Sequence, residues 1–424
     1  MSIHIDPYEE AKKQLKATVE LLGLGDDVYE ALAVPERVIQ VKVPVRMDDG
    51  SVKVFIGWRS QHNSALGPYK GGVRYHPEVT MNEVIALSMW MTWKCSLMGL
   101  PYGGGKGGVR VDPMRLSVGE LERLSRAYFS AIAEFVGEDL DIPGPDLFTD
   151  ERVMTWFMDE YYRIKRSQYF GVVTGKPIEL GGLRARAYAT GLGVAIVARE
   201  LAKKVIGGIE GAVVAIQGFG KVGYNAARFL AEMGARIVAI GDIGGAIYKA
   251  SGFTIGEVRD EIKAVVDRTG SVVNYDKIDR RISNEELLTL KVDILVPAAI
   301  ENVITEHNAR DIKAKLIVEG ANAPTTVEAE KILTERGIII APDILANAGG
   351  VVMSHIEWVN NRMGGWVTED EARRKLEEKM LEAFHRTWSF WESKLDKSKH
   401  NLRSATYAIA VDRVVRAMKL RGWI

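Results

Sequence analysis

The chain has 424 residues, which is long enough for two or three domains with separate cores. Lysine plus arginine and aspartate plus glutamate number 56 each, so no basic excess points to nucleic acid or an anionic membrane as a partner. No apolar run reaches membrane-spanning length, and the single cysteine, Cys95, excludes an intrachain disulfide. We therefore expect a soluble protein of a reducing compartment, the cytoplasm.

The first half of the chain alternates predicted strands and helices. Apolar alternation on either side of a turn at 48–50 indicates a pair of strands, and a stretch with helical apolar spacing follows. Ser117 and Glu120 have the spacing of a capping box, so a helix is predicted to begin there. The predicted elements are strands at 38–47 and 51–60, helices at 80–98 and 117–135, a loop at 137–151 and a helix ending near Lys165.

A domain boundary is predicted at 171–182, beyond which strands and helices alternate more regularly. Short, apolar, β-branched strands joined by helices are typical of a doubly wound parallel sheet. We expect an α/β substrate-binding and oligomerisation domain at 1–182 and a Rossmann-type dinucleotide-binding domain at 183–349. The helices of about 350–424 should pack back against the first domain. The strands predicted in the second domain are 211–217, 235–242, 292–297, 314–320 and 337–342.

The stretch 67–108 carries three lysines that stand beside glycines or apolar residues rather than on a polar face. They are Lys70, Lys94 and Lys106. Burial and like charge both disfavour a protonated amine, so in one cleft each lysine would lower the pKa of the others. Three such cations would bind a small dianion, and the glycines would let the backbone approach it closely. The competing interpretation is a glycine-rich loop with unrelated surface lysines.

A glycine-rich loop follows the apolar strand predicted at 211–217 and opens a helix, as a dinucleotide site requires. In such a loop the first glycine permits a tight turn, the second admits a pyrophosphate, and the third lets the helix pack on the strand. The phosphates would then face the helix N-terminus. Asp242 ends the next strand, where its carboxylate can accept hydrogen bonds from an adenosine ribose. The loop is Gly218-Phe219-Gly220-Lys221-Val222-Gly223.

Six motifs occur in a specific order and spacing: GPYKGGVRYH, WKCSLMGLPYGGGKGG, DIPGPD, GFGKVG, GANAPTT and NAGGVVMSHIEW. On these motifs the chain resembles, over nearly its whole length, the hexameric short-subunit glutamate dehydrogenases of the Glu/Leu/Phe/Val dehydrogenase superfamily. The resemblance implies a homohexamer that reversibly deaminates L-glutamate to 2-oxoglutarate and ammonia with a nicotinamide coenzyme. The seven histidines are scattered, so no metal is expected.

The resemblance also implies roles for individual residues. Lys106 would be the catalytic lysine, and Asp146 would be its partner in proton transfer. Lys70, helped by Ser354, would hold the side-chain carboxylate of the substrate, and Lys94 would hold the α-carboxylate. The remaining residues implied are Gly71 and Val351 in the substrate pocket, and Thr190, Asn322 and Asn347 at the coenzyme, with Asn347 also near the substrate.

The sequence departs from the usual family pattern at a few positions. Gly144 stands where alanine is expected, Lys221 where asparagine is expected, and Ala323 where glycine is expected, and the segment 183–186 also differs. None of these changes removes a catalytic group, so they bear on the coenzyme contacts and on the pocket wall more than on the chemistry.

Two alternatives to glutamate dehydrogenase remain open from the sequence. One is a branched-chain or aromatic amino-acid dehydrogenase of the same superfamily. An apolar substrate would leave Lys70 buried and unpaired at a cost of several kcal/mol, so a dicarboxylate is preferred. The other is a non-catalytic dinucleotide-binding regulator, which would have no need of Lys106 and Asp146.

The choice of coenzyme depends on opposing charges near the adenosine ribose. The carboxylate of Asp242 would repel a 2′-phosphate and so favours NAD. Lys221 and Lys249 lie on either side of this position in the sequence and would favour NADP if they reached the phosphate. We expect NAD to be preferred, with dual use of NAD and NADP as the alternative.

Overall fold

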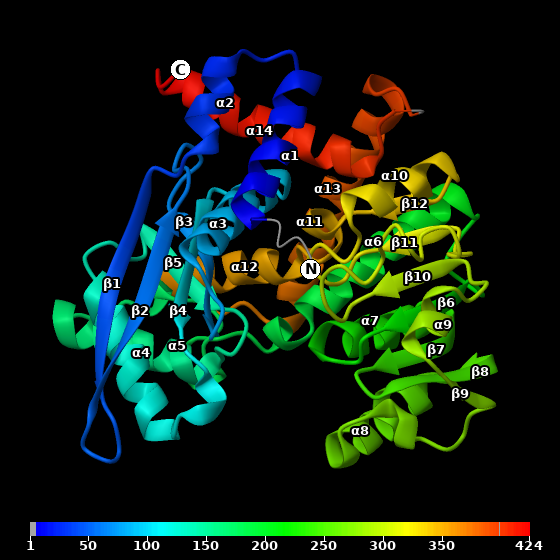
Figure 1. Cartoon of the computed structure of the whole chain (residues 1–424), viewed down its shortest axis with the longest axis horizontal. Coiled ribbons are helices and arrows are strands. Elements are labelled where there is room, and N and C mark those ends of the chain that lie inside the picture. Colours follow the sequence, from blue (N-terminus) through cyan, green and yellow to red (C-terminus); the bar gives the residue numbers. More distant parts are fainter. Residues whose placement is uncertain (1–5, 398) are drawn as a thin grey trace. The chain divides into compact units, whose positions relative to one another are not determined.

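The computed structural model describes residues 6–397 and 399–424, and the chain divides into two compact units (Figure 1). Unit 1 contains the residues up to 186 together with 353–372 and 407–424. Unit 2 contains residues 187–352 and 373–406. Over the described residues, no helix combines the length and the apolar character that crossing a bilayer demands.

Unit 1 is built on a five-stranded sheet with the strand order β1-β2-β4-β3-β5. The first two strands form the predicted hairpin, and β2 also pairs antiparallel with β4. β3 lies parallel to both β4 and β5, so the ends of these three strands point the same way. The strands are β1 (Arg37–Arg46), β2 (Val52–Gln61), β3 (Tyr69–His76), β4 (Gly103–Arg110) and β5 (Asp141–Pro145).

The helices of unit 1 begin and end largely where the sequence predicts. Ser117 and Glu120 do form a capping box at the start of α4, and α4 packs on α5 through the stacked rings of Phe129 and Phe157, 4.7 Å apart. The helices are α1 (Pro7–Leu21), α2 (Asp26–Ala33), α3 (Met81–Leu97), α4 (Val118–Ile132) and α5 (Glu151–Lys165). Short turns of 3-10 helix are η1 (Pro113–Arg115), η2 (Phe170–Val172), η3 (Ile178–Leu180) and η4 (Arg184–Ala187).

No strand was predicted in the glycine-rich motifs of unit 1, and the loop predicted at 137–151 was wrong in part. GPYKGGVRYH and GGGKGG contribute the central strands β3 and β4, and the segment 137–151 contains the edge strand β5. The glycines are needed for close packing rather than for turns. A Cβ at Gly104 would lie 2.0 Å from the carbonyl oxygen of Ser88 on α3, so only glycine lets that helix lie against β4.

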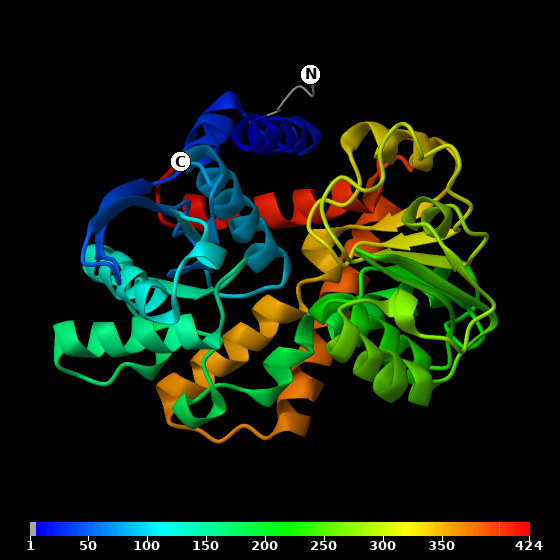
Figure 2. The ribbon, with the colours of Figure 1, turned by 60° about the horizontal axis from the view of Figure 1, so that its bottom comes forward.

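Unit 2 is a seven-stranded sheet with the order β12-β11-β10-β6-β7-β8-β9 and helices flanking it (Figure 2). The strands from β12 to β7 are parallel, as predicted for a doubly wound sheet. β8 pairs antiparallel with β7, and β9 pairs antiparallel with β8; neither pairing was predicted. The turn from Asp242 to Gly245 is too short for the crossover connection that a parallel β8 would need. The strands are β6 (Val213–Gln217), β7 (Arg236–Asp242), β8 (Gly245–Phe253), β9 (Arg280–Ile282), β10 (Ile294–Pro297), β11 (Leu316–Val318) and β12 (Ile339–Ala341).

Most helices of unit 2 connect successive strands. The helices are α6 (Ala189–Val205), α7 (Lys221–Glu232), α8 (Lys263–Thr269), α9 (Asn284–Leu288), α10 (Val327–Glu335) and α11 (Asp343–Ala346), with the short helical turns η5 (Glu257–Ile262) and η6 (Val272–Asn274). Three further helices run across the division of the chain: α12 (Gly349–Met363), α13 (Glu369–Lys394) and α14 (Leu402–Leu420).

The C-terminal helices differ from the prediction in one respect. They were expected to belong entirely with the first domain, but residues 373–406 belong to unit 2. The cause is polar and aromatic packing of α13 on α6: Arg199 pairs with Glu377 at 2.9 Å, and Lys204 lies over the ring of Trp388.

Candidate functional site

Lys106, Asp146 and Arg74 form a linked set of charges in unit 1. Lys106 is on β4 with 5% of its surface exposed, and its Nζ lies 3.0 Å from Oδ1 of Asp146, which follows β5. Oδ2 of the same carboxylate accepts a hydrogen bond of 2.8 Å from Nε of Arg74 on β3. The parallel pairing of β3 with β4 and β5 therefore brings the predicted catalytic pair together and adds an arginine that the sequence analysis did not identify.

The pKa values of Lys106 and Asp146 are both lowered, although burial acts on the two groups in opposite directions. Burial lowers the pKa of Lys106, and the charges of Arg74 and Lys94 lower it further, while Asp146 opposes the shift. Burial alone would raise the pKa of Asp146, but the charges of Lys106 and Arg74 outweigh it and hold that pKa well below its usual range. The result is a persistent carboxylate beside a lysine that loses its proton more easily than a surface lysine.

Lys70 on β3 is a buried cation that lacks an ion-pair partner within the described part of the chain. It is 3% exposed, and its Nζ donates to the carbonyl oxygen of Ile142 at 3.2 Å. Burial lowers its pKa to about 7, and the charge of Arg186 contributes to the same shift. Because a buried ammonium without an anion is costly, this position favours an anionic ligand.

The wall beside Lys70 is formed by Gly144 and Thr174. A Cβ added at Gly144 would lie 3.1 Å from Nζ of Lys70 and 3.3 Å from Oγ1 of Thr174. The Thr174 hydroxyl is buried and has no hydrogen-bond partner among the described residues. An ammonium and a hydroxyl next to the same glycine would both be satisfied by the oxygens of a carboxylate.

A buried ion pair fixes the loop that carries Thr174. Glu357 on α12 and Lys176 pair at 2.7 Å with both side chains fully buried, and the same carboxylate accepts hydrogen bonds from the backbone N–H of Gly175. Breaking a buried pair by removing one partner is strongly destabilising, so the loop has little freedom. Neither partner was identified from the sequence, although Glu357 lies within the NAGGVVMSHIEW motif.

The other residues predicted for the substrate site lie on several elements. Lys94 is in the last turn of α3, and it is close enough to Lys106 to lower that pKa. Gly71 on β3 faces β4, because a Cβ there would lie 1.5 Å from the carbonyl oxygen of Gly105. Ser354 is buried on α12 within unit 1, whereas Val351 is in the first turn of the same helix and belongs to unit 2.

In unit 2 the loop from Gly218 to Gly223 has the geometry of a dinucleotide-binding turn. Gly218 has a φ of +101°, and a Cβ at Gly223 would lie 1.8 Å from the carbonyl oxygen of Gly218, so both positions require glycine. Gly220 is the N-cap of α7, no side chain caps this helix, and a Cβ there would meet nothing within 4 Å. The uncapped helix end and the open space over Gly220 fit a pyrophosphate.

The rest of this loop packs against the unit. Phe219 is buried and its ring meets that of Tyr224 edge-on at 5.5 Å, whereas Lys221 is exposed and Val222 is half-buried in the first turn of α7. The side chains of Phe219 and Val222 thus hold the loop in place, and Lys221 is the charged residue of the loop that solvent can reach.

Asp242 ends β7 as predicted, but its carboxylate already has partners. Oδ1 accepts hydrogen bonds from the backbone N–H of Gly244 and the hydroxyl of Ser271, and Oδ2 accepts one from the backbone N–H of Val272. Lys249, which was expected to compete for a 2′-phosphate, instead pairs with Glu257 at 2.6 Å. The carboxylate is therefore fixed in direction, and one of the two opposing lysines is engaged elsewhere.

Asn322 and Asn347, which were both predicted to contact the coenzyme, lie next to each other. The side-chain amide of Asn347, at the end of α11, donates to Oδ1 of Asn322 at 2.9 Å. Asn322 lies in the loop after β11, and Thr190 is in the first turn of α6. No group of three His, Cys, Asp or Glu side chains suited to a metal ion occurs in residues 6–397 and 399–424.

Comparison with protein families matches nearly all of this chain. The model for the Glu/Leu/Phe/Val dehydrogenase dimerisation domain matches residues 35–163, and the model for Glutamate/Leucine/Phenylalanine/Valine dehydrogenase matches residues 181–422. These two ranges contain the charges around Lys106 and the glycine loop, respectively.

Similar full-length proteins are glutamate dehydrogenases. The chain is 64% identical over 419 residues to a glutamate dehydrogenase of Aeropyrum pernix, covering 99% of both chains. It is 56% identical to an NADP-specific glutamate dehydrogenase of Saccharolobus shibatae, covering 97% of this chain and 95% of that protein. It is 49% identical to an NAD-specific glutamate dehydrogenase of Staphylococcus aureus, covering 96% of each.

A solved structure agrees with these sequence matches. The hetero-hexameric glutamate dehydrogenase of Thermus thermophilus, in a form with leucine bound, is 35% identical with a TM-score of 0.91, covering all of this chain and 98% of that one. The motifs, the two folded units and the relatives agree over the whole length. The chain belongs to the glutamate/leucine/phenylalanine/valine dehydrogenase family.

Proposed function

We propose that the protein catalyses the reversible oxidative deamination of L-glutamate to 2-oxoglutarate and ammonia with a nicotinamide coenzyme. The observation that carries this choice of substrate is Lys70, a buried lysine without an ion-pair partner among the described residues. A dicarboxylate supplies the missing anion, whereas the apolar side chain of a branched-chain or aromatic amino acid does not. The relatives that match over the full length carry the name glutamate dehydrogenase.

We assign the recognition of the substrate chiefly to residues of unit 1. Lys70 would bind the side-chain carboxylate, with Ser354 and the unpartnered hydroxyl of Thr174 donating to its oxygens. Lys94 would bind the α-carboxylate, and Gly71 and Val351 would border the pocket. Binding an anion at Lys70 would raise its pKa from about 7, so above about pH 7 the site would take up a proton as glutamate binds.

Lys106 would act as the general base and acid. The α-amine must lose a proton before the α-carbon is oxidised, water must lose one when it adds to the iminium carbon, and ammonia must gain one as it leaves. A lysine with a depressed pKa suits both directions of this transfer. Asp146 would exchange protons with it and, because its own pKa is low, would return to the carboxylate after each transfer.

Unit 2 would hold the coenzyme, which supplies the acceptor for the hydride that leaves the α-carbon. Gly218, Phe219, Gly220, Lys221, Val222 and Gly223 would form its pyrophosphate site, and Asp242 would bind the adenosine ribose. Thr190, Asn322 and Asn347 would contact the nicotinamide half. NAD is the expected coenzyme because Asp242 is fixed in position by Ser271 and Val272, and Lys249 is paired with Glu257. NADP use is the alternative, through Lys221.

The assembly and the compartment are also part of this proposal. We infer a homohexamer, supported by the match to a dimerisation-domain model and by the hexameric structural relative. Multi-angle light scattering of the purified protein should give about six times the mass of the 46.9 kDa chain. A cytoplasmic location is supported by the single cysteine, Cys95, which is buried and free.

A single assay tests the proposed function. Purified protein is incubated with NAD or NADP and with L-glutamate, L-norleucine or L-leucine, and reduced coenzyme is followed by its absorbance. Glutamate should be favoured over norleucine in kcat/KM by at least about a hundredfold, as expected for a charge pair in a dry pocket. A protein that binds coenzyme without turnover of any amino acid would instead be a regulator, and a preference for leucine would overturn the choice of glutamate.

A further inference from the structure

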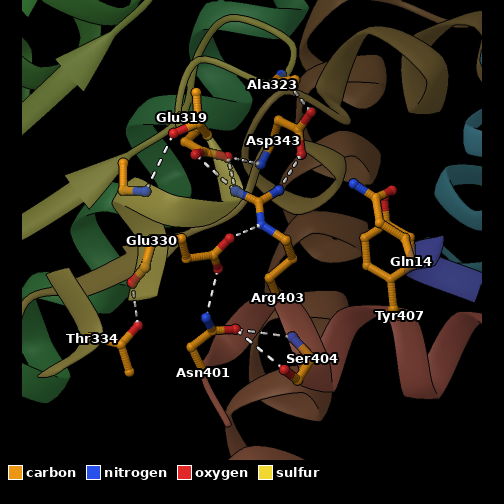
Figure 3. Close-up of polar contacts among 12 residues, drawn as sticks. Gln14, Glu319, Ala323, Glu330, Thr334, Asp343, Asn401, Arg403, Ser404 and Tyr407 are labelled. Carbon is orange, nitrogen blue, oxygen red and sulfur yellow. Dashed lines mark hydrogen bonds and ion pairs between the residues drawn. The ribbon is translucent and has the colours of Figure 1, made fainter. Parts of the chain in front are cut away.

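One arginine of unit 2 contacts three carboxylates at once. Nη2 of Arg403 lies 2.8 and 2.7 Å from the two carboxylate oxygens of Glu319, Nη1 lies 3.0 Å from Oδ1 of Asp343, and Nε lies 2.8 Å from Oε2 of Glu330 (Figure 3). Asn401 adds a hydrogen bond to the other oxygen of Glu330. We call Arg403 and these three carboxylates the Arg403 cluster.

Two of the three carboxylates stand just beyond the ends of strands. Glu319 directly follows β11, Asp343 opens α11 shortly after β12, and Glu330 is on α10, which connects the two strands. In a doubly wound sheet a dinucleotide lies across the carboxyl ends of the parallel strands, with one mononucleotide on each side of the switch point. The glycine loop follows β6, so β11 and β12 are on the side that receives the second mononucleotide, the nicotinamide half.

A continuous path of hydrogen bonds leads from the cluster to the predicted coenzyme contacts. Glu319 Oε2 accepts from the backbone N–H of Asp343 at 2.9 Å, and Asp343 Oδ2 accepts from the backbone N–H of Ala323 at 2.9 Å. Ala323 is next to Asn322, and the helix that Asp343 opens ends at Asn347. The two asparagines then bond to each other. Glu319 and Asp343 therefore each contact Arg403 and also accept a hydrogen bond from the backbone, Glu319 from α11 and Asp343 from the loop of Ala323.

The loop is held in a conformation that it would not adopt easily. Ala323 has a φ of +43°, in the left-handed region that non-glycine residues rarely adopt. The hydrogen bond from Asp343 helps to impose this conformation, and Asp343 in turn needs a counter-charge because Glu319 is fully buried beside it. Without a cation, the neighbouring carboxylates would repel one another in a poorly solvated place.

We propose that Arg403 is a positioning residue for the coenzyme: by pairing with Glu319, Glu330 and Asp343 it fixes the loop and helix that present Asn322 and Asn347 to the nicotinamide. This inference rests on the proposed function. The adenosine half of the coenzyme depends instead on the glycine loop and Asp242, which follow β6 and β7, away from β11 and β12 in the sheet. Loss of Arg403 should therefore weaken one half of the coenzyme site and spare the other.

The test compares binding of NAD with binding of ADP-ribose, which lacks only the nicotinamide. Isothermal titration calorimetry is performed on the full chain as wild type and as Arg403→Gln and Arg403→Lys. In Arg403→Gln, the Kd of NAD should rise by roughly tenfold, while the Kd of ADP-ribose should change by less than about twofold. Arg403→Lys keeps the charge without the three-way contact and should recover part of the loss.

Arg199→Gln is the matched control. Arg199 also bridges two carboxylates in unit 2, Glu200 and Glu377, and its side chain is 21% exposed against 16% for Arg403. This variant should leave both dissociation constants unchanged. If Arg403→Gln weakens NAD and ADP-ribose equally, or weakens neither, the positioning role is wrong.

A second variant keeps the test decisive if Arg403→Gln does not fold. If Arg403→Gln is unfolded by its unpaired carboxylates, the double variant Arg403→Gln with Glu319→Gln removes one of them and should restore folding. Relative to wild type, the Kd of NAD should still rise more than the Kd of ADP-ribose in the double variant. An equal change in the two dissociation constants would overturn the inference. Failure of the proposed function is a separate outcome, because it is measured by turnover of glutamate in the wild type, whereas this test measures only coenzyme binding.

Discussion

Nζ of Lys106 on β4 lies 3.0 Å from Oδ1 of Asp146, which follows β5, and β3 lies between these two strands in the sheet. We expect Lys106→Ala to lower kcat for glutamate by roughly 10²–10⁴-fold, because no other group at this position can carry the proton. Coenzyme binding, measured by calorimetry, should be unchanged because the glycine loop is in unit 2. Asp146→Asn should reduce kcat similarly, since an amide keeps the shape but carries no proton. A Lys106→Ala enzyme with a tenth of wild-type kcat would remove this residue from the mechanism.

Arg74 gives a prediction about pH that the sequence alone did not suggest. Its guanidinium helps to hold the pKa of Asp146 below its ordinary value. In Arg74→Gln the pKa of Asp146 should rise, so protonation of Asp146 would interfere at a higher pH than in wild type. The acid limb of the kcat/KM profile should therefore move upward in pH. Arg126→Gln, which breaks ion pairs on α4 away from Asp146, serves as the control and should leave the profile in place.

The substrate preference should depend on Lys70 and Ser354. Replacing them together, as Lys70→Leu with Ser354→Val, removes the partner of the side-chain carboxylate and adds apolar surface. Glutamate should lose on the order of 3 kcal/mol or more in kcat/KM, while norleucine and methionine should gain. The exposed Lys53→Leu on β2 controls for loss of positive charge. A double variant that is inactive on every substrate would mean that pocket shape, and not this pair, sets specificity.

The coenzyme preference should depend on Asp242 and on the residue that orients it. Asp242→Ser should raise the ratio of kcat/KM for NADP over NAD, because it removes the charge that opposes a 2′-phosphate. Ser271→Ala deletes one of the hydrogen bonds that fix the carboxylate and should move the ratio in the same direction by a smaller amount. A wild type that prefers NADP, or a ratio indifferent to Asp242→Ser, would contradict this account.

Stability should fall as pH rises through the range in which Glu319 titrates. Burial raises the pKa of Glu319 from 4.5 to about 7, with Asp343 and Glu330 adding to the shift and Arg403 opposing it. Between these values the folded protein keeps a proton that the unfolded chain has lost, so this group contributes stability that declines with increasing pH. Glu319→Gln cannot titrate, so its stability relative to wild type, from urea unfolding, should increase from pH 5 to pH 8. An unchanged difference would show that Glu319 is ionised throughout.

Local patterns in the sequence predicted the glycine loop and the parallel strands of unit 2, because motif spacing and apolar runs are local properties. The roles of Lys106 and Asp146 came from the resemblance to a family and stay predictions, although the two side chains do lie together. The strand identity of GPYKGG and GGGKGG was missed because glycine is normally rare in strands. Only the tertiary contact of α3 with β4 explains it, and no local pattern records that contact.

Partners that are distant in the chain were missed for the same reason. Arg74 is 72 residues from Asp146, and Arg403 is 84 residues from Glu319. Each is one of many arginines, and only the folded sheet indicates which carboxylate it meets. The partner of Lys249 was missed in the same way, since Glu257 lies in the segment that follows β8.

The approach of β3 to β4 has a consequence for how this enzyme can diverge. A single methyl group at Gly71 would collide with Gly105, and Lys70 and Lys106 are the immediate neighbours of these two glycines. Any larger residue there would force the strands apart and change the separation of the two ammonium groups at the same time. The spacing of positions 70 and 106 is therefore set by the strand packing, and new substrate preferences should arise from exchange of side chains, such as Lys70 and Ser354, rather than from movement of the strands.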